Sequence, residues 1–213
     1  EITTRLVGSE MCIRDRNYTH IVEPEFKIDD KKLPELEAAM DRLKKMEPVQ
    51  YVLGHTEFYG RTFKVDPAVL IPRPETELLC RDAIKLGMRV YRMRSPYGKN
   101  AEPVRILDLC TGSGCIAWTM ALSIPGSRVT AVDISDAALE VAAGQDFASE
   151  LKSRETFKPE FIKADVLDSE QEIELGPFDM VLSNPPYIME SEKEDMRRNV
   201  LESVSYTHLR AHE

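Results

Sequence analysis

The chain has 213 residues, 42% of them hydrophobic and 31% charged, which is the composition of a globular protein. It contains no uninterrupted apolar run of about 18 residues and no basic-then-apolar signal pattern, so we expect a cytoplasmic protein without a membrane partner. The net charge of −9 speaks against a broad phosphate-binding surface, and therefore against a nucleic-acid partner.

The two ends of the chain fit neither a helical nor a strand period. Residues 1–16 and 204–213 resemble translated adapter sequence, and we exclude them from the fold as non-native tails. Apolar residues at helical spacing, with Pro34 in the first turn, predict a helix at 33–46. The short apolar stretch at 50–54 then predicts a strand.

The next segment contains a turn signal and a proline-rich loop. Alternating residues on both sides of Tyr59 and Gly60 predict a β-hairpin at 56–66. The proline-rich loop that follows leads into a helix predicted at 74–93.

From residue 104 onward, strand and helix patterns alternate. Strands are predicted at 104–110, 128–135, 160–166 and 178–184, and helices at 115–124 and 136–151. Alternation of this kind implies right-handed crossovers between parallel strands. We therefore expect an α/β protein with a doubly wound, mostly parallel sheet.

A glycine-rich loop joins the first strand of this region to its first helix. Gly112 and Gly114 permit positive φ and let a ligand lie against bare backbone. The helix behind them offers unpaired N–H groups and the positive end of its dipole, which suit a carboxylate or phosphate. We assign cofactor binding to Thr111, Gly112, Ser113 and Gly114, although many purely structural strand-to-helix turns carry similar glycines.

Acidic residues lie at or near the ends of three successive predicted strands. Asp133 can accept hydrogen bonds from both hydroxyls of a ribose, and Asp165 can meet an adenine amino group. The glycine pattern is shorter than that of a dinucleotide site, with Cys110 where a first glycine often stands. These features favour S-adenosylmethionine, whose sulfonium cation is tolerated near a carboxylate such as Asp108. The four cysteines lack paired metal-ligand spacing, so we expect free thiols and no metal.

The stretch Asn184–Tyr187, Asn-Pro-Pro-Tyr, ends the last predicted strand. The side-chain oxygen of Asn184 and the backbone carbonyl of Pro185 can accept the two hydrogens of a substrate –NH₂ group, and Asn184 also borders the expected cofactor. Pro185 and Pro186 lack N–H groups and have fixed φ, while Tyr187 can pack against the planar substrate group. Such a corner can align the nitrogen for in-line methyl transfer. We assign catalysis to Asn184, Pro185 and Tyr187, and substrate binding to all four; a simple Asn-Pro turn is the alternative.

This stretch resembles the motif shared by S-adenosylmethionine-dependent methyltransferases of DNA adenine, of some RNAs and of protein glutamine. Residues 47–79, which include IPRPETE at 71–77, closely resemble the linker of the release-factor glutamine methyltransferases. The resemblance implies a Rossmann-like class I methyltransferase fold with S-adenosylmethionine as cofactor. It further implies N5-methylation of the glutamine in the Gly-Gly-Gln motif of peptide chain release factors. Thr76 and Glu77 would then border the cofactor pocket, or else simply start a helix.

The resemblance also implies a domain organisation. Residues 17–50 would be the remnant of an N-terminal helical substrate-recognition domain, 51–73 a β-hairpin linker, and 74–203 a methyltransferase domain that lacks its last strands. Two alternatives stay open: a methyltransferase of nucleic-acid amino groups, and an inactive truncated fragment. The acidic charge and the IPRPETE segment favour a release factor over a nucleic acid.

Overall fold

The computed structural model describes residues 30–94, 102–154, 156–168 and 176–185. The chain divides into two compact units, Glu1–Arg42 and Leu43–Glu213. A 3-10 turn, η1 (Asp30–Lys32), leads into helix α3 (Leu33–Lys44), which begins in the first unit and confirms the helix predicted there.

A short helix, α4 (Val49–Leu53), follows where the sequence predicted a strand, so that prediction is wrong. Pro48 precedes the helix with φ of −55°, and Gly54 ends it in the left-handed conformation with φ of 74°. These two residues confine the apolar segment to little more than one helical turn. The buried hydroxyl of Tyr51 donates a hydrogen bond of 2.7 Å to the Val69 carbonyl and fixes the helix to the following loop.

The predicted hairpin is confirmed: strands β1 (His55–Phe58) and β2 (Arg61–Lys64) pair antiparallel. Its two turn residues, Tyr59 and Gly60, have φ of 50° and 71°. Positive φ at both central positions is typical of the tight turns that match the twist of paired strands.

Aromatic side chains pack the hairpin into the main core of the second unit. Phe58 and Phe63 are fully buried, with ring centroids 6.0 Å apart. The Phe63 ring lies 5.0 Å from Phe147, which in turn lies 5.2 Å from Trp118. The hairpin is therefore part of this core.

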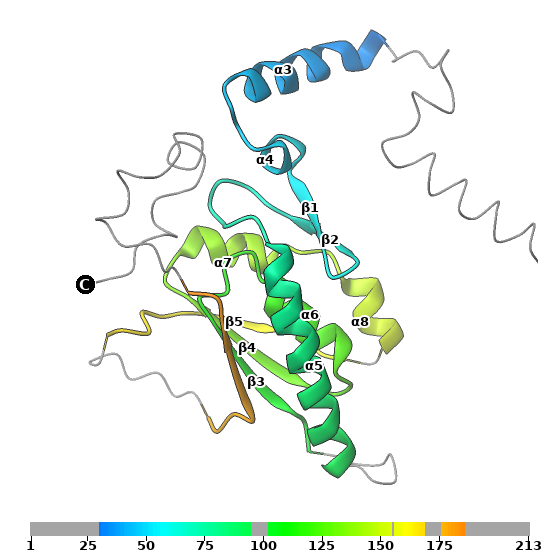
Figure 1. Ribbon diagram of the computed structural model, residues 1–213, viewed down its shortest axis with the longest axis vertical. Coiled ribbons are helices and arrows are strands. Elements are labelled where there is room, and N and C mark those ends of the chain that lie inside the picture. The colour runs from blue at the N-terminus through cyan, green and yellow to red at the C-terminus, as the bar shows by residue number, and fades with distance from the viewer. Residues whose placement is uncertain (1–29, 95–101, 155, 169–175, 186–213) are drawn as a thin grey trace, which may run out of the picture. The chain divides into compact units, whose positions relative to one another are not determined.

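The central sheet has four parallel strands in the order β5-β4-β3-β6 (Figure 1). They are β3 (Arg105–Leu109), β4 (Arg128–Asp133), β5 (Glu160–Lys163) and β6 (Met180–Ser183). The parallel α/β architecture expected from the alternating pattern is confirmed, together with the separate antiparallel hairpin. Chain direction is the same in all four strands, so their carboxyl ends meet at one edge of the sheet.

Helices α5 (Pro74–Arg94) and α6 (Cys115–Ser123) cover one face of this sheet (Figure 1). Helix α6 is buried along most of its length, which fits its uniformly apolar sequence. The core between helices and sheet includes Cys80 and Ala83 of α5, Trp118 and Met120 of α6, and Ile106, Val129, Ala131, Met180 and Leu182 of the strands.

The single helix predicted at 136–151 is instead two helices, α7 (Asp136–Ala143) and α8 (Ala148–Arg154). The Ser135 hydroxyl accepts a hydrogen bond from Ala138 N and caps α7. The break lies at 144–147, where Phe147 turns into the aromatic core. Gly144 is the C-cap residue of α7, and its N–H donates a hydrogen bond to the Glu140 carbonyl.

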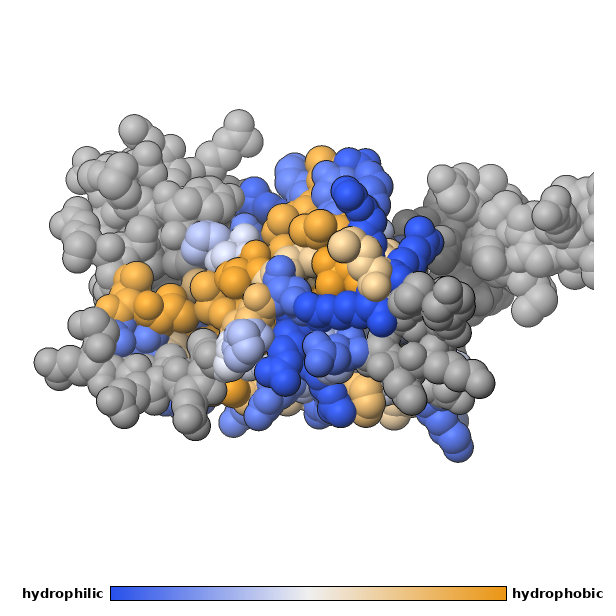
Figure 2. Space-filling model, turned by 90° about the horizontal axis from the view of Figure 1, so that it is seen from below, coloured by the Kyte–Doolittle hydropathy of each residue, from blue (hydrophilic) through white to orange (hydrophobic). Residues whose placement is uncertain are grey.

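The other face of the sheet carries a smaller apolar cluster that includes Leu107, Val132 and Ala164. Val181 and Leu167 are 57% and 65% exposed. On the side seen in Figure 2, apolar surface lies between hydrophilic patches.

Within the described ranges, no helix is both long and apolar enough to cross a membrane.

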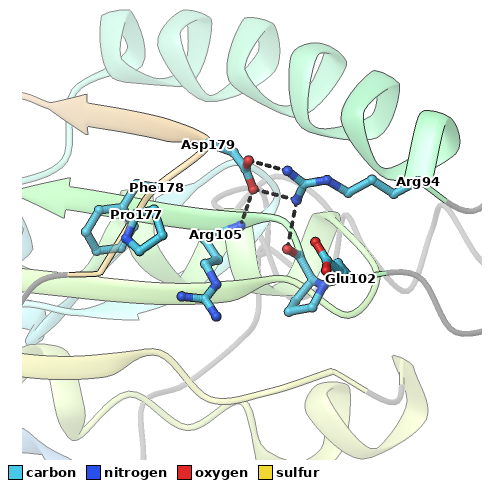
Figure 3. A pocket seen from close by; sticks show the side chains of 7 residues that line it. Arg94, Glu102, Arg105, Pro177, Phe178 and Asp179 are labelled. Atoms are coloured by element: carbon cyan, nitrogen blue, oxygen red, sulfur yellow. Dashed lines mark hydrogen bonds and ion pairs between the residues drawn. The ribbon is translucent and has the colours of Figure 1, made fainter.

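A pocket of about 340 Å³ lies at the amino ends of β3 and β6 (Figure 3). Arg94 at the end of α5 forms an ion pair with Asp179, which also accepts a hydrogen bond of 2.9 Å from Arg105 N. These contacts join the end of α5 to two strands. The pocket is at the opposite edge of the sheet from the glycine loop, so it is not the predicted site.

Candidate functional site

The loop between β3 and α6 turns sharply because several of its residues have positive φ. Cys110, Gly112 and Gly114 have φ of 57°, 54° and 77°, a region that residues other than glycine rarely adopt. Thr111 N donates a hydrogen bond of 3.0 Å to the Val132 carbonyl in β4. A Cβ on Gly112 would meet no atom within 4 Å, so open space lies beside the backbone there.

Asp108 lies beneath this loop and is fully buried. Its Oδ2 accepts hydrogen bonds from the Thr111 hydroxyl at 2.6 Å and from Ala117 N at 3.1 Å. Its Oδ1 has no hydrogen-bond partner in the part of the chain that the structure describes. Burial raises the pKa of Asp108 to about 7, while the hydrogen bonds from Thr111 and Ala117 act in the opposite direction. Asp108 therefore stabilises the loop through its hydrogen bonds with Thr111 and Ala117. Its contact with a cofactor stays a prediction.

Asp133 lies at the end of β4 with both carboxylate oxygens engaged by backbone. Oδ2 accepts a hydrogen bond of 2.8 Å from Gly112 N, and Oδ1 accepts one of 3.0 Å from Ser135 N. Each carboxylate oxygen can accept a second hydrogen bond. Asp133 can therefore hold the glycine loop and still accept hydroxyl donors from a ligand.

Asp165 follows β5 at the neighbouring strand end and is half-buried. Its Oδ1 accepts a hydrogen bond of 2.9 Å from Leu167 N, which shapes the turn after the strand. Ala164 N donates a hydrogen bond of 3.0 Å to the Asp133 carbonyl, so the segments that carry the two acids are joined directly.

Asn184 and Pro185 follow β6, on the other side of β3. The side-chain nitrogen of Asn184 lies 3.4 Å from the hydroxyl oxygen of Thr76, in the first turn of α5. With the amide nitrogen donating to the Thr76 hydroxyl, the amide oxygen can accept a hydrogen bond from a ligand. Pro185 is exposed. Pro186 and Tyr187 lie outside the described residues, and their roles stay predictions.

The strand order brings the predicted residues to one edge of the sheet. In spatial order, the carboxyl ends of β5, β4, β3 and β6 carry Asp165, Asp133, the glycine loop and Asn184, at the last residue of the strand or just beyond it. This is the edge at which ligands bind in open parallel sheets. The Ser183 hydroxyl donates a hydrogen bond of 3.0 Å to the Leu109 carbonyl and joins the ends of β6 and β3.

One polar residue beside the loop was not found from the sequence. The side chain of Gln145 contacts both the hairpin and the carbonyl of Ser113. No motif marks this glutamine, because its partners are backbone groups distant in the sequence. Only the fold brings them together.

Comparison of the sequence with known proteins identifies the family of this chain. The family model "Methyltransferase small domain" matches residues 97–211, more than half of the chain. A protein of Koribacter versatilis named release factor glutamine methyltransferase is 46% identical over 155 residues, covering 72% of this chain and 48% of the relative. A protein of the same name from Flavobacterium psychrophilum is 36% identical over 182 residues, covering 85% of this chain and 58% of the relative.

The chain spans about half the length of these curated relatives. Among solved structures, a tRNA (uracil-54, C5)-methyltransferase of Pyrococcus abyssi in complex with S-adenosyl-L-homocysteine aligns with a TM-score of 0.40 and 20% identity. That alignment covers 62% of this chain and 28% of the other.

Proposed function

The chain belongs to the methyltransferase small domain family, and from this premise we propose that it methylates peptide chain release factors. In this proposal S-adenosylmethionine is the methyl donor, and the acceptor is the side-chain N5 of the glutamine in the Gly-Gly-Gln motif. The names of the relatives with 36–46% identity support the class of substrate. The arrangement of the sheet edge supports the chemistry.

The residues of the loop fit the proposed cofactor. The open space beside Gly112 accepts a ligand against the backbone, and the amino end of α6 suits the methionine carboxylate. Asp133 has hydrogen-bonding capacity left for the ribose hydroxyls. When bound, S-adenosylmethionine supplies an activated methyl group.

The amide nitrogen of glutamine is a poor nucleophile because its lone pair is delocalised. The Oδ1 of Asn184 and the carbonyl oxygen of Pro185 would each accept one of its hydrogens, which holds the nitrogen and favours pyramidalisation. Positioning and fixed dipoles then lower the barrier without a strong general base. The nitrogen loses a proton after it has gained the methyl group.

One observation carries the proposal: Asn184 lies at the same sheet edge as Gly112 and Asp133, with Thr76 beside its amide nitrogen. In that orientation the amide oxygen is available for a substrate N–H. A nucleic-acid amino group has the same hydrogen-bonding pattern, but the net charge of −9 disfavours such a partner.

The test is incubation of the protein with purified release factor and S-adenosylmethionine carrying a labelled methyl group, followed by mass spectrometry of the peptides. We expect label on the glutamine of the Gly-Gly-Gln peptide, and a rate lower by about 100-fold or more in Asn184→Ala. DNA and RNA are offered in parallel reactions. Label on nucleic acid alone, or on no substrate, contradicts the proposal.

A further inference from the structure

The side chain of Gln145 bridges the hairpin and the glycine loop. It follows helix α7 and is 7% exposed. Its Oε1 accepts a hydrogen bond of 2.8 Å from Lys64 N, and its Nε2 donates to the Lys64 carbonyl at 2.9 Å and to the Ser113 carbonyl at 3.2 Å. The amide therefore pairs with the outer edge of β2 as a neighbouring strand would.

These contacts allow only one orientation of the amide. Lys64 N can only donate, and the two carbonyls can only accept. A flipped amide would place Oε1 against carbonyl oxygens and Nε2 against an N–H group. Both donor hydrogens of Gln145 are used, so the side chain is a rigid connection.

The glycine loop is thus held from two sides. Asp133 accepts from Gly112 N, while Gln145 donates to the carbonyl of the next residue, Ser113. These two contacts fix the peptide groups around the open space at Gly112. Asp133 belongs to strand β4 of the sheet, whereas Gln145 is itself held by Lys64 of the hairpin.

We propose that Gln145 is a positioning residue that couples the β1–β2 hairpin to the glycine loop, so that cofactor affinity depends on the hairpin. The inference rests on the proposed use of S-adenosylmethionine but not on the identity of the methyl acceptor. The inference gives the hairpin a part in cofactor binding, although the hairpin precedes the glycine loop by more than forty residues in the sequence.

Two variants test the coupling. Gln145→Met keeps the length and volume of the side chain but loses all three hydrogen bonds. Gln145→Glu keeps the acceptor but turns an anionic oxygen toward the two carbonyls. Lys158→Met is the matched control. The exposed side chain of Lys158 donates a hydrogen bond of 3.0 Å through Nζ to the carbonyl of Ala143, the last residue of α7.

The readouts are the dissociation constant of S-adenosylhomocysteine by calorimetry, well below the Tm of each variant, and amide exchange of Lys64 by NMR. We expect the dissociation constant to rise roughly tenfold in Gln145→Met and further in Gln145→Glu, and to stay unchanged in Lys158→Met. In the wild-type protein, ligand binding should slow exchange of the Lys64 N–H.

A merely structural role would lower the Tm of the Gln145 variants and leave the dissociation constant unchanged, which would overturn the inference. Unchanged exchange of Lys64 on ligand binding would overturn it as well. Absence of binding to the wild-type protein would be a different result, because it contradicts the proposed cofactor itself and the inference with it.

Discussion

The side-chain nitrogen of Asn184 and the hydroxyl oxygen of Thr76 lie 3.4 Å apart, although 108 positions separate the two residues in the sequence. Thr76 is 7% exposed and sits in the first turn of α5. The contact, in which the amide nitrogen faces the hydroxyl, holds the Asn184 side chain against the start of α5. It thereby connects the segment 71–77 to the corner that follows β6.

The first prediction follows from that contact. Thr76→Val keeps the shape of the side chain but removes the hydroxyl, so the Asn184 side chain loses the hydrogen bond that holds it in place. We expect kcat for methyl transfer to fall about tenfold, equivalent to one hydrogen bond, with the KM for cofactor unchanged. Thr76→Ser keeps the hydroxyl and should retain most activity. Equal rates in the Val and Ser variants would show that the hydroxyl has no such role.

The second prediction separates two glycines of the loop. Gly112→Ala adds a Cβ into open space at φ of 54° and should cost about 1–2 kcal/mol of stability, while weakening S-adenosylhomocysteine binding more than tenfold. Gly114→Ala places its Cβ 3.0 Å from the Ala142 Cβ and 3.1 Å from Trp118 Cδ1, so it should destabilise the fold more. Urea unfolding and calorimetry measure both effects. The reverse order of stabilities would contradict this assignment.

The third prediction concerns pH. The pKa of Asp108 is raised from 3.8 to about 7. The unfolded chain therefore loses this proton at lower pH than the folded chain, and stability falls as pH rises toward 7. Between pH 6 and pH 8 the free energy of unfolding should decrease by roughly 1 kcal/mol from this group. Asp108→Asn, which cannot ionise, should lack that part of the decrease in urea unfolding; an identical pH dependence in both proteins refutes the prediction.

The fourth prediction has the opposite sign. Arg61 of β2 binds both oxygens of Glu150 in α8, at 2.6 Å and 3.0 Å, and lowers the pKa of that carboxyl. The ion pair stabilises the folded state above the ordinary pKa of glutamate, and this contribution is lost as pH falls through the lowered value. Glu150→Gln should cost about 1 kcal/mol at pH 7 and less at pH 3. Glu140→Gln, at an exposed position of α7, is the control and should cost little at either pH.

Much of the architecture could be predicted from local patterns. The alternation of apolar strands with helices identified the parallel sheet, and the pair Tyr59-Gly60 identified the hairpin turn. The predicted strand ends also place Asp133, Asp165 and Asn184 on a common edge. These features depend on periodicity and on backbone conformation, which neighbouring residues largely determine.

The failures have both local and tertiary causes. The segment 50–54 is apolar enough for a strand, but Pro48 and Gly54 bound a helical turn, and the Tyr51 hydroxyl is fixed by a loop residue. The helix predicted at 136–151 ends at its C-cap residue Gly144, and beyond the break Phe147 packs against Phe63 and Trp118. The bonds of Gln145 and the engagement of both Asp133 oxygens by backbone depend on groups that only folding brings together.

Trp118 is the chain's single tryptophan. Its indole is 1% exposed, and its Nε1 donates a hydrogen bond of 2.8 Å to the Ala142 carbonyl. An indole shielded from water emits at shorter wavelength than a hydrated one. Intrinsic fluorescence therefore reports on one known location, next to Gly114, and its red shift during denaturation would mark the moment at which solvent reaches the back of the loop.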